Sequence, residues 1–328
     1  MDKTTQQTTG AQGNRPVVGR FAPTPSGRMH LGNVFSCLMA WLAVRSAGGR
    51  LVMRIEDLDI RAQNPQNASL LLDDLRWLGL DWDEGPYYQS KRGEVYAAAI
   101  DSLAERGMTY PCFCTRSELH AATAPHASDG TYLYQGTCRG LTPEQVAQRS
   151  AVRPPATRLM VPPAEDPSGT IEFTDLAFGP QREVLAQECG DFLLKRSDGI
   201  VAYQLAFVVD DGEMDITQVV RGRDLLGSAA RQTWLSRLLG YEPPTFGHVP
   251  LLVAPDGRRL SKRERDLDMG ALRERFGRPE AILGALASSV GMAEAGEALR
   301  ADELVDRFSW NLLSAHEQDI VVADGVLV

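Results

Sequence analysis

Two motifs far apart in the chain contain residues that could bind and polarise a polyphosphate. The first, His30-Leu31-Gly32-Asn33, follows a Pro-x-Pro turn and Gly27, and it begins an apolar segment with a helical pattern. Free amides and the macrodipole favour anions at a helix N-terminus, where His30 could donate a hydrogen bond and Gly32 would allow close approach. An ordinary histidine at a helix start is the alternative. The spacing of the Pro-x-Pro turn and Gly27 ahead of His30 favours a nucleotide site that contains His30, Gly32 and Asn33.

The second motif places a cation where it could follow charge on the phosphates. Lys262 lies within residues 255–263, a loop rich in glycine and arginine, and it is one of only four lysines in the chain. A mobile cation on such a loop can stabilise charge that develops during a transfer reaction. A solvated basic loop is the commoner alternative. Together, the two motifs favour catalytic roles for His30 and Lys262 at one nucleotide.

The start of the chain has the order strand, helix, strand. Residues 17–21 are a short apolar run, residues 31–47 have a helical pattern that ends at Gly48-Gly49, and residues 51–55 are again apolar. This order is typical of a βαβ unit in a parallel sheet. Glu56 would then lie at the carboxyl end of the second strand, where open α/β sheets bind ligands.

Later segments continue this alternation and then interrupt it. Helical patterns at 71–78, 96–106 and 228–239, and an apolar strand at 216–220 that ends at Arg221, indicate further sheet-and-helix structure. A turn at 197–199 separates two apolar runs, the second of which ends at Tyr203. Residues 110–180 have poor helical periodicity and are expected to form an insertion, whereas the pattern from residue 269 onward is helical.

The composition restricts the class of protein. The chain has 328 residues, 43% hydrophobic and 23% charged, which is ordinary for a globular protein of about two domains. The net charge of −9 argues against a protein that coats DNA or RNA in general. No apolar run reaches the roughly 20 residues of a membrane helix, so no membrane partner is expected. Residues 1–15 are polar, are no secretory signal, and are expected to be a disordered tail.

Three of the five cysteines lie close together in sequence and suggest a metal site. Cys112, Cys114 and Cys138 belong to this group, and an odd number of cysteines without a signal peptide argues against a disulfide framework. A structural zinc site needs four ligands, and histidine is the better fourth ligand on general chemistry. Reduced, metal-free cysteines are the alternative. The available fourth ligands are His120, His126, Tyr132 and Tyr134.

Four further segments give the sequence a resemblance to a known family. RFAPT at 20–24, RIEDLD at 54–59, VVDD at 208–211 and VRGRD at 220–224 occur in that order. With a HIGH-like motif at 30–33 and a KMSKS-like motif at 259–263, they resemble the glutamyl and glutaminyl branch of the class I aminoacyl-tRNA synthetases over about residues 17–268. The resemblance implies a Rossmann-like α/β catalytic domain that activates an amino acid with ATP as substrate, with Mg²⁺ expected.

The amino acid that the resemblance implies is glutamate. A glutamate site must neutralise a side-chain carboxylate, which suits the planar fork of arginine, and it must also hold an ammonium group. Surface ion pairs are the alternative for such charged residues. The family's glutamate pocket corresponds here to Arg20, Phe21, Ala22, Pro23, Thr24, Glu56, Tyr203 and Arg221.

The resemblance also implies which residues bind the metal and where the domains begin and end. A short branch of the family, the glutamyl-queuosine tRNA(Asp) synthetases, has a Cys-x-Cys … Tyr-x-x-x-Cys pattern for one structural Zn²⁺, which implies Cys112, Cys114, Tyr134 and Cys138 as ligands. The catalytic domain would comprise residues 16–109 and 190–268, and residues 110–189 would be an insertion of the acceptor-end type. Residues 269–328 would be a helical stub without an anticodon-binding domain.

This short branch implies a particular acceptor. Such an enzyme forms glutamyl-adenylate without tRNA and then transfers glutamate to queuosine at the wobble position of tRNA(Asp). Glutamate, ATP and that tRNA are therefore the expected partners, no DNA or membrane is expected, and the location is expected to be cytoplasmic. Two alternatives stay open: a minimal glutamyl-tRNA synthetase that charges tRNA(Glu), and a non-catalytic RNA-binding module derived from a synthetase.

Overall fold

Parallel strands form the central layer of the computed structural model, which describes residues 15–115, 117–118, 133–258, 268–316 and 318–322. β1 (Val18–Phe21), β2 (Arg50–Ile55) and β3 (Glu84–Tyr88) form one parallel sheet, and β9 (Gln218–Gly222) pairs in parallel with β10 (Thr245–Val249). β9 lies beside β1, since the Thr217 amide donates to the Val18 carbonyl at 2.9 Å. The predicted parallel α/β architecture is therefore confirmed.

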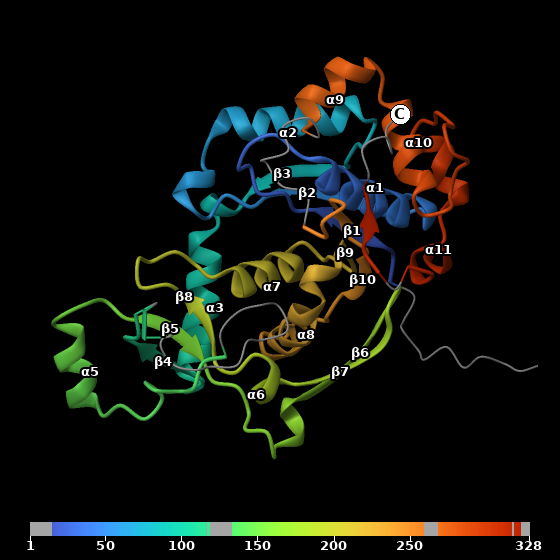
Figure 1. Ribbon diagram of the computed structural model, residues 1–328. Helices are drawn as coiled ribbons and strands as arrows, with labels where there is room; N and C mark the ends of the chain where they lie inside the picture. The colour runs from blue at the N-terminus through green and yellow to red at the C-terminus, as the bar shows by residue number, and fades with distance from the viewer. Residues whose placement is uncertain (1–14, 116, 119–132, 259–267, 317, 323–328) are drawn as a thin grey trace, which may run out of the picture.

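Helices cover both faces of this layer (Figure 1). Leu51, Met53 and Ile55 of β2 belong to one apolar cluster with α1 (Leu31–Ser46) and α2 (Pro65–Trp77). Val52 belongs to the opposite cluster, with α3 (Gly93–Glu105), α7 (Tyr203–Glu213) and α8 (Ala229–Leu238). Because side chains alternate along a strand, each strand sends every second residue to the α7 face.

The helix that follows β1 begins and ends where its sequence dictates. His30 has extended backbone angles at the N-cap of α1, and its amide donates to the Asn33 side-chain oxygen at 3.4 Å. The helix ends before Gly48, whose φ of +64° is a left-handed conformation that glycine adopts without strain. The N-terminal turn of α1 is thus fixed at the carboxyl edge of β1.

The antiparallel strands come between β3 and β9 in the sequence. β4 (Thr109–Cys112), β5 (Ala156–Leu159) and β8 (Phe192–Lys195) form one sheet, near α5 (Pro143–Ser150). β6 (Thr170–Asp175) and β7 (Gly179–Val184) form a long hairpin that leads to α6 (Leu185–Glu188). The hairpin returns to the central layer, because the Leu176 amide donates to the Phe246 carbonyl of β10 at 2.9 Å.

The final segment combines helices with one more strand. α9 (Met269–Phe276), α10 (Glu280–Ser288) and α11 (Trp310–Ser314) confirm the predicted helical character, and each contributes buried residues to the apolar cluster that contains α1 and α2. β12 (Ile320–Val321) was not expected from the sequence, and it pairs in parallel with β11 (Leu252–Val253). Among the described residues, no helix has both the length and the apolar character that crossing a bilayer requires.

Candidate active site and metal centre

A cavity of about 600 Å³ opens at the carboxyl edge of the parallel layer. Its walls include every described residue that the sequence assigns to ATP or glutamate. They are Arg20, Phe21, Ala22, Pro23, Thr24, His30, Gly32, Asn33, Glu56, Tyr203 and Arg221. Lys262 lies outside the described residues, but the chain re-enters the structure at Asp268, which forms a β-bridge with His30. One cavity thus brings together segments from β1, α1, β2, α7 and β9.

Three arginines surround a single buried phenylalanine on the α7 face of the sheet. The guanidinium carbons of Arg20, Arg54 and Arg221 lie 5.5, 6.0 and 5.0 Å from the centroid of the Phe207 ring. They come from β1, β2 and β9, each at a position that strand alternation directs toward α7. Each of the three arginines is no more than 5% exposed, so their positive charges need anionic partners.

Two acidic residues on α7 neutralise part of this charge. Asp211 accepts a hydrogen bond from Nη1 of Arg54 at 2.5 Å, and it lies 3.7 Å from Nε of Arg20. Arg54 also lies 3.7 Å from Asp210. Burial acts against the charged form, yet these carboxylates raise the pKa of Arg54. Arg54 is therefore a structural cation, fully buried and already paired.

Glu56 lies at the end of β2 and faces the cavity with a partly free carboxylate. One oxygen accepts from Nη2 of Arg54 at 3.2 Å, and the side chain is 12% exposed. Burial raises the pKa of Glu56, and the attraction of Arg54 and Arg20 only partly opposes that shift. The second oxygen is available to an ammonium group that enters the cavity.

Arg221 is the cavity arginine without an anionic partner. Within the described part of the chain it pairs with no carboxylate; it donates instead to His248 Nε2 at 3.0 Å, to the Leu225 carbonyl at 3.0 Å and to the Tyr203 hydroxyl at 3.5 Å. Burial lowers the pKa of Arg221, and the interactions with Tyr203 and Asp211 that favour its charged form only partly oppose this shift. A buried guanidinium in this state could pair with a carboxylate that enters the cavity.

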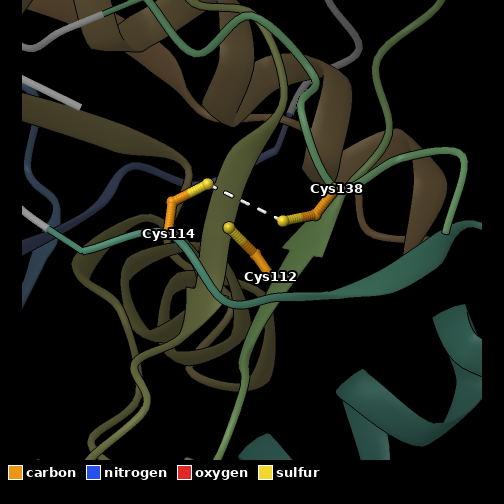
Figure 2. Close-up of side chains that lie close together, drawn as sticks. All are labelled: Cys112, Cys114 and Cys138. Carbon is orange, nitrogen blue, oxygen red and sulfur yellow. Dashed lines mark hydrogen bonds between the residues drawn. The ribbon is translucent and has the colours of Figure 1, made fainter. Parts of the chain in front are cut away.

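The three clustered cysteines come together at the edge of the antiparallel sheet (Figure 2). Cys112 ends β4, Cys114 follows it, and Cys138 comes from a separate segment, with all three ligand atoms within 4.8 Å of one another. The Tyr134 hydroxyl lies 3.5 Å from Cys112 Sγ and 3.6 Å from Cys114 Sγ. Burial opposes ionisation of Cys112, but hydrogen bonds to Tyr134 and Arg158 lower the pKa of its thiol overall.

These four side chains fit the size of a tetrahedral metal site. Bonds of about 2.3 Å from zinc to sulfur put tetrahedral ligands roughly 3.8 Å apart. The distance from Cys114 Sγ to Cys138 Sγ is 3.6 Å, and the two tyrosine distances are similar. Among the described residues, the Tyr134 hydroxyl is therefore close enough to the cysteines to be a candidate fourth ligand, whereas His120, His126 and Tyr132 lie outside the described residues.

Sequence reasoning missed residues that support the cavity rather than line it. Phe207, His248 and Asp175 have no predicted role, because a single phenylalanine, histidine or aspartate outside a recognisable motif gives no signal in the sequence. Asp211 and Arg54 were included only as parts of family-like segments. The acid pair inside the apolar run VVDD was the one signal available, since two carboxylates in such a run require buried cations.

Comparison with known proteins identifies the chain's relatives. Residues 16–323 match the family described as "tRNA synthetases class I (E and Q), catalytic domain". A "Glutamyl-Q tRNA(Asp) synthetase" of Symbiobacterium thermophilum is 47% identical over 89% of this chain and 92% of the relative. One of the same name from Nitratidesulfovibrio vulgaris is 49% identical over 84% and 87%.

Solved structures show the same fold. A glutamate-tRNA synthetase from Elizabethkingia anophelis has a TM-score of 0.77 at 25% identity, over 95% of this chain and 69% of that one. A glutamate tRNA ligase from Elizabethkingia meningosepticum, solved in complex with its amino acid, has a TM-score of 0.76 at 25% identity, over 95% and 68%.

Proposed function

The chain belongs to the glutamyl and glutaminyl family of class I tRNA synthetases, and from this membership we infer that it activates glutamate with ATP and transfers it to queuosine in tRNA(Asp). One observation supports glutamate activation: Arg221, which is buried and has no carboxylate partner among the described residues, shares a cavity with Glu56 and His30. The acceptor rests on the relatives named for tRNA(Asp), which match this chain over most of their length.

We propose that the ends of the substrate are distinguished by charge. Arg221 and Arg20 receive the side-chain carboxylate, with a hydrogen bond from Tyr203, and Glu56 receives the ammonium group. The backbone of residues 21–24 closes this side of the pocket. Opposite charges at the two ends would orient the α-carboxylate toward the nucleotide and disfavour glutamine, which leaves a buried guanidinium unneutralised.

The chemistry follows from that orientation. An oxygen of the α-carboxylate attacks the α-phosphorus of ATP, the bond to the bridging oxygen breaks, and diphosphate leaves. His30, Gly32 and Asn33 at the start of α1 would bind the phosphates, and Lys262 would stabilise their developing charge, with Mg²⁺ as counter-ion. A queuosine hydroxyl then attacks the activated carbonyl carbon, its proton is lost, and AMP leaves with the electron pair of the broken bond.

We propose that Cys112, Cys114, Tyr134 and Cys138 hold one structural Zn²⁺ ion. When bound, the ion would crosslink β4 to the segment that contains Tyr134 and Cys138. Residues 110–189, which include this site, would form the insertion between the catalytic halves 16–109 and 190–268, ahead of the stub at 269–328. Because the acceptor is a tRNA, we place the reaction in the cytoplasm.

Two assays test the function. The purified protein should exchange radiolabelled diphosphate into ATP with glutamate and without tRNA, and Lys262→Ala should reduce the exchange rate. Labelled glutamate should then transfer to tRNA(Asp) that contains queuosine and not to tRNA(Asp) that lacks it. Transfer to tRNA(Glu) instead would identify a minimal glutamyl-tRNA synthetase, and absence of exchange under any condition would identify a non-catalytic module.

A further inference from the structure

A buried chain of three hydrogen-bonded side chains ends on Arg221, which pairs with no carboxylate in the part of the chain that the structure describes. Arg221 Nε donates to His248 Nε2 at 3.0 Å, and His248 Nδ1 lies 2.6 Å from Asp175 Oδ2. Their exposed fractions are 5%, 0% and 1%. The cavity wall includes Arg221, whereas His248 and Asp175 lie behind it. The two inner residues therefore act on the site only through Arg221.

The hydrogen-bond partners fix the tautomer of His248. A guanidinium can only donate, so His248 Nε2 must carry a lone pair and accept. The ring proton then sits on Nδ1 and is donated to Asp175 Oδ2, which leaves the imidazole neutral. Burial lowers the pKa of His248, and the nearby charge of Arg221 acts in the same direction, in agreement with a neutral ring.

Asp175 is itself held in place by the turn of the β6–β7 hairpin. Its Oδ1 accepts from the amides of Ala177 at 3.0 Å and Phe178 at 2.9 Å. Its carboxylate also accepts from the backbone amide of His248 at 3.2 Å. The hairpin thus holds the Asp175 carboxylate in a fixed position against His248, although the two residues are 73 positions apart in the sequence.

Aromatic rings fix the plane of the same guanidinium. The guanidinium carbon of Arg221 lies 5.0 and 5.2 Å from the ring centroids of Phe207 and Phe246, and Phe246 stacks on His248 with planes 15° apart. Hydrogen bonds to His248, Leu225 and Tyr203 use three of the five N–H donors. One donor remains on each terminal nitrogen, a pair that matches the two oxygens of a carboxylate.

From this geometry we infer that His248 and Asp175 are positioning residues that set Arg221 for the side-chain carboxylate of the amino-acid substrate. The inference rests on the proposed function for the identity of that substrate. Without the acceptor at His248 Nε2, the guanidinium would turn toward other partners, and its two remaining donors would no longer face the carboxylate together. This change would weaken binding of the amino acid and would leave binding of the nucleotide unaffected.

Three substitutions separate this role from simple packing. His248→Asn keeps a donor for Asp175 in place of Nδ1 but removes the acceptor for Arg221. His248→Gln keeps an acceptor at about the position of Nε2. Asp175→Asn keeps the oxygen that accepts from Ala177 and Phe178, but its amide donates to Nδ1 and forces the ring proton onto Nε2, where it opposes Arg221.

The expected result is a selective change in affinity. The KM for glutamate in diphosphate exchange should rise about 10- to 100-fold in His248→Asn and Asp175→Asn, as for loss of a hydrogen bond to a charged group. The KM for ATP should not change, and His248→Gln should restore most of the glutamate affinity.

Nitrogen NMR of histidine-labelled protein should show the proton on Nδ1 in the unaltered protein and on Nε2 in Asp175→Asn. An unchanged glutamate KM in both variants, or equal losses for ATP and glutamate, would overturn the inference.

Calorimetric titration with glutamate keeps this test independent of turnover. If the unaltered protein binds glutamate but catalyses no exchange, the proposed activity fails and the binding constants of the same variants still decide the role of His248. If it catalyses exchange and the variants bind glutamate as tightly as the unaltered protein, only the role of His248 and Asp175 fails. Absence of both binding and exchange overturns both proposals.

Discussion

The backbone amide of Met269 donates to the carbonyl oxygen of Met29 at 2.9 Å. This bond joins the first residue of α9 to the residue before His30. Asp268, directly before it, caps α9 by accepting from the amides of Gly270 and Ala271. The described chain therefore resumes at Asp268 directly beside the start of α1, where this bond and the β-bridge between Asp268 and His30 hold it.

Replacement of Asp74 should weaken this support. The Asp74 carboxylate is fully buried and accepts from Arg28 at 3.2 Å and from Arg273 of α9 at 3.0 Å. Asp74→Asn removes the charge that both arginines share, so we expect a loss of about 1–3 kcal/mol in the free energy of unfolding. The rate of diphosphate exchange should also fall, because α9 and the turn before His30 are held together less firmly when only the backbone contacts between them remain. Urea unfolding and exchange kinetics measure the two effects.

The neighbouring Asp73 provides a matched control. It also pairs with Arg273, but its side chain is 58% exposed. Asp73→Asn should change stability by no more than about 1 kcal/mol, as for other exposed ion pairs, and should leave exchange unaffected. Equal effects of the two substitutions would show that α9 is not anchored through Asp74.

The parallel layer could be predicted from sequence because its signals are local. The apolar runs of β1 and β2, and the helix between them with its terminal glycines, set their boundaries to within a residue or two. α7 could not be predicted in this way. Its residues from Leu205 to Asp211 are all buried, so no polar face produces a helical period, and Tyr203 was interpreted as the end of an apolar run.

The cavity residues were predictable where they lie at strand ends in recognisable segments. Arg20, Glu56 and Arg221 satisfy this condition. The partners that orient them do not, since His248 and Asp175 meet only through packing of the β6–β7 hairpin on β10. No spacing in the sequence reports a contact of that kind, and a histidine in a buried strand has many ordinary explanations.

Alanine at position 32 should disturb the nucleotide site. A Cβ at Gly32 would lie 3.2 Å from Cε1 and Nδ1 of His30, closer than an ordinary contact, so the imidazole must move. Because small displacements of catalytic groups lower rates by up to roughly 100-fold, we expect Gly32→Ala to reduce exchange and raise the KM for ATP. Gly93→Ala, at the start of α3 with open space around it, is the control and should leave both parameters unchanged.

Loss of one metal ligand should be visible without any activity measurement. The protein as purified should contain one zinc per chain by mass spectrometry, and Cys138→Ser should lower the zinc content and the melting temperature together, because metal binding contributes to folding. Tyr134→Phe should weaken zinc binding by more than the roughly 10- to 100-fold typical of outer-shell changes. Cys189→Ala, buried outside the cluster, should retain the metal. Full zinc affinity in Tyr134→Phe would assign the fourth ligand to another residue.

The pH dependence of glutamate binding should reveal Glu56. Burial raises its pKa above that of an exposed carboxyl group, even though Arg54 and Arg20 lie nearby. On acidification, Glu56 therefore takes up its proton at a higher pH than exposed carboxyl groups do, and it then loses the charge that holds the substrate ammonium. The KM for glutamate should therefore be constant near neutral pH. As the pH falls, it should begin to rise before exposed carboxyl groups take up their protons. Glu56→Gln should raise this KM by about 10- to 100-fold. It should also remove the acid dependence above the pH range in which exposed carboxyl groups, including that of the substrate side chain, take up protons. Glu94→Gln, on the exposed start of α3, should retain the profile of the unaltered protein. A glutamate KM that rises equally in Glu56→Gln as the pH falls would assign the acid limb to another group.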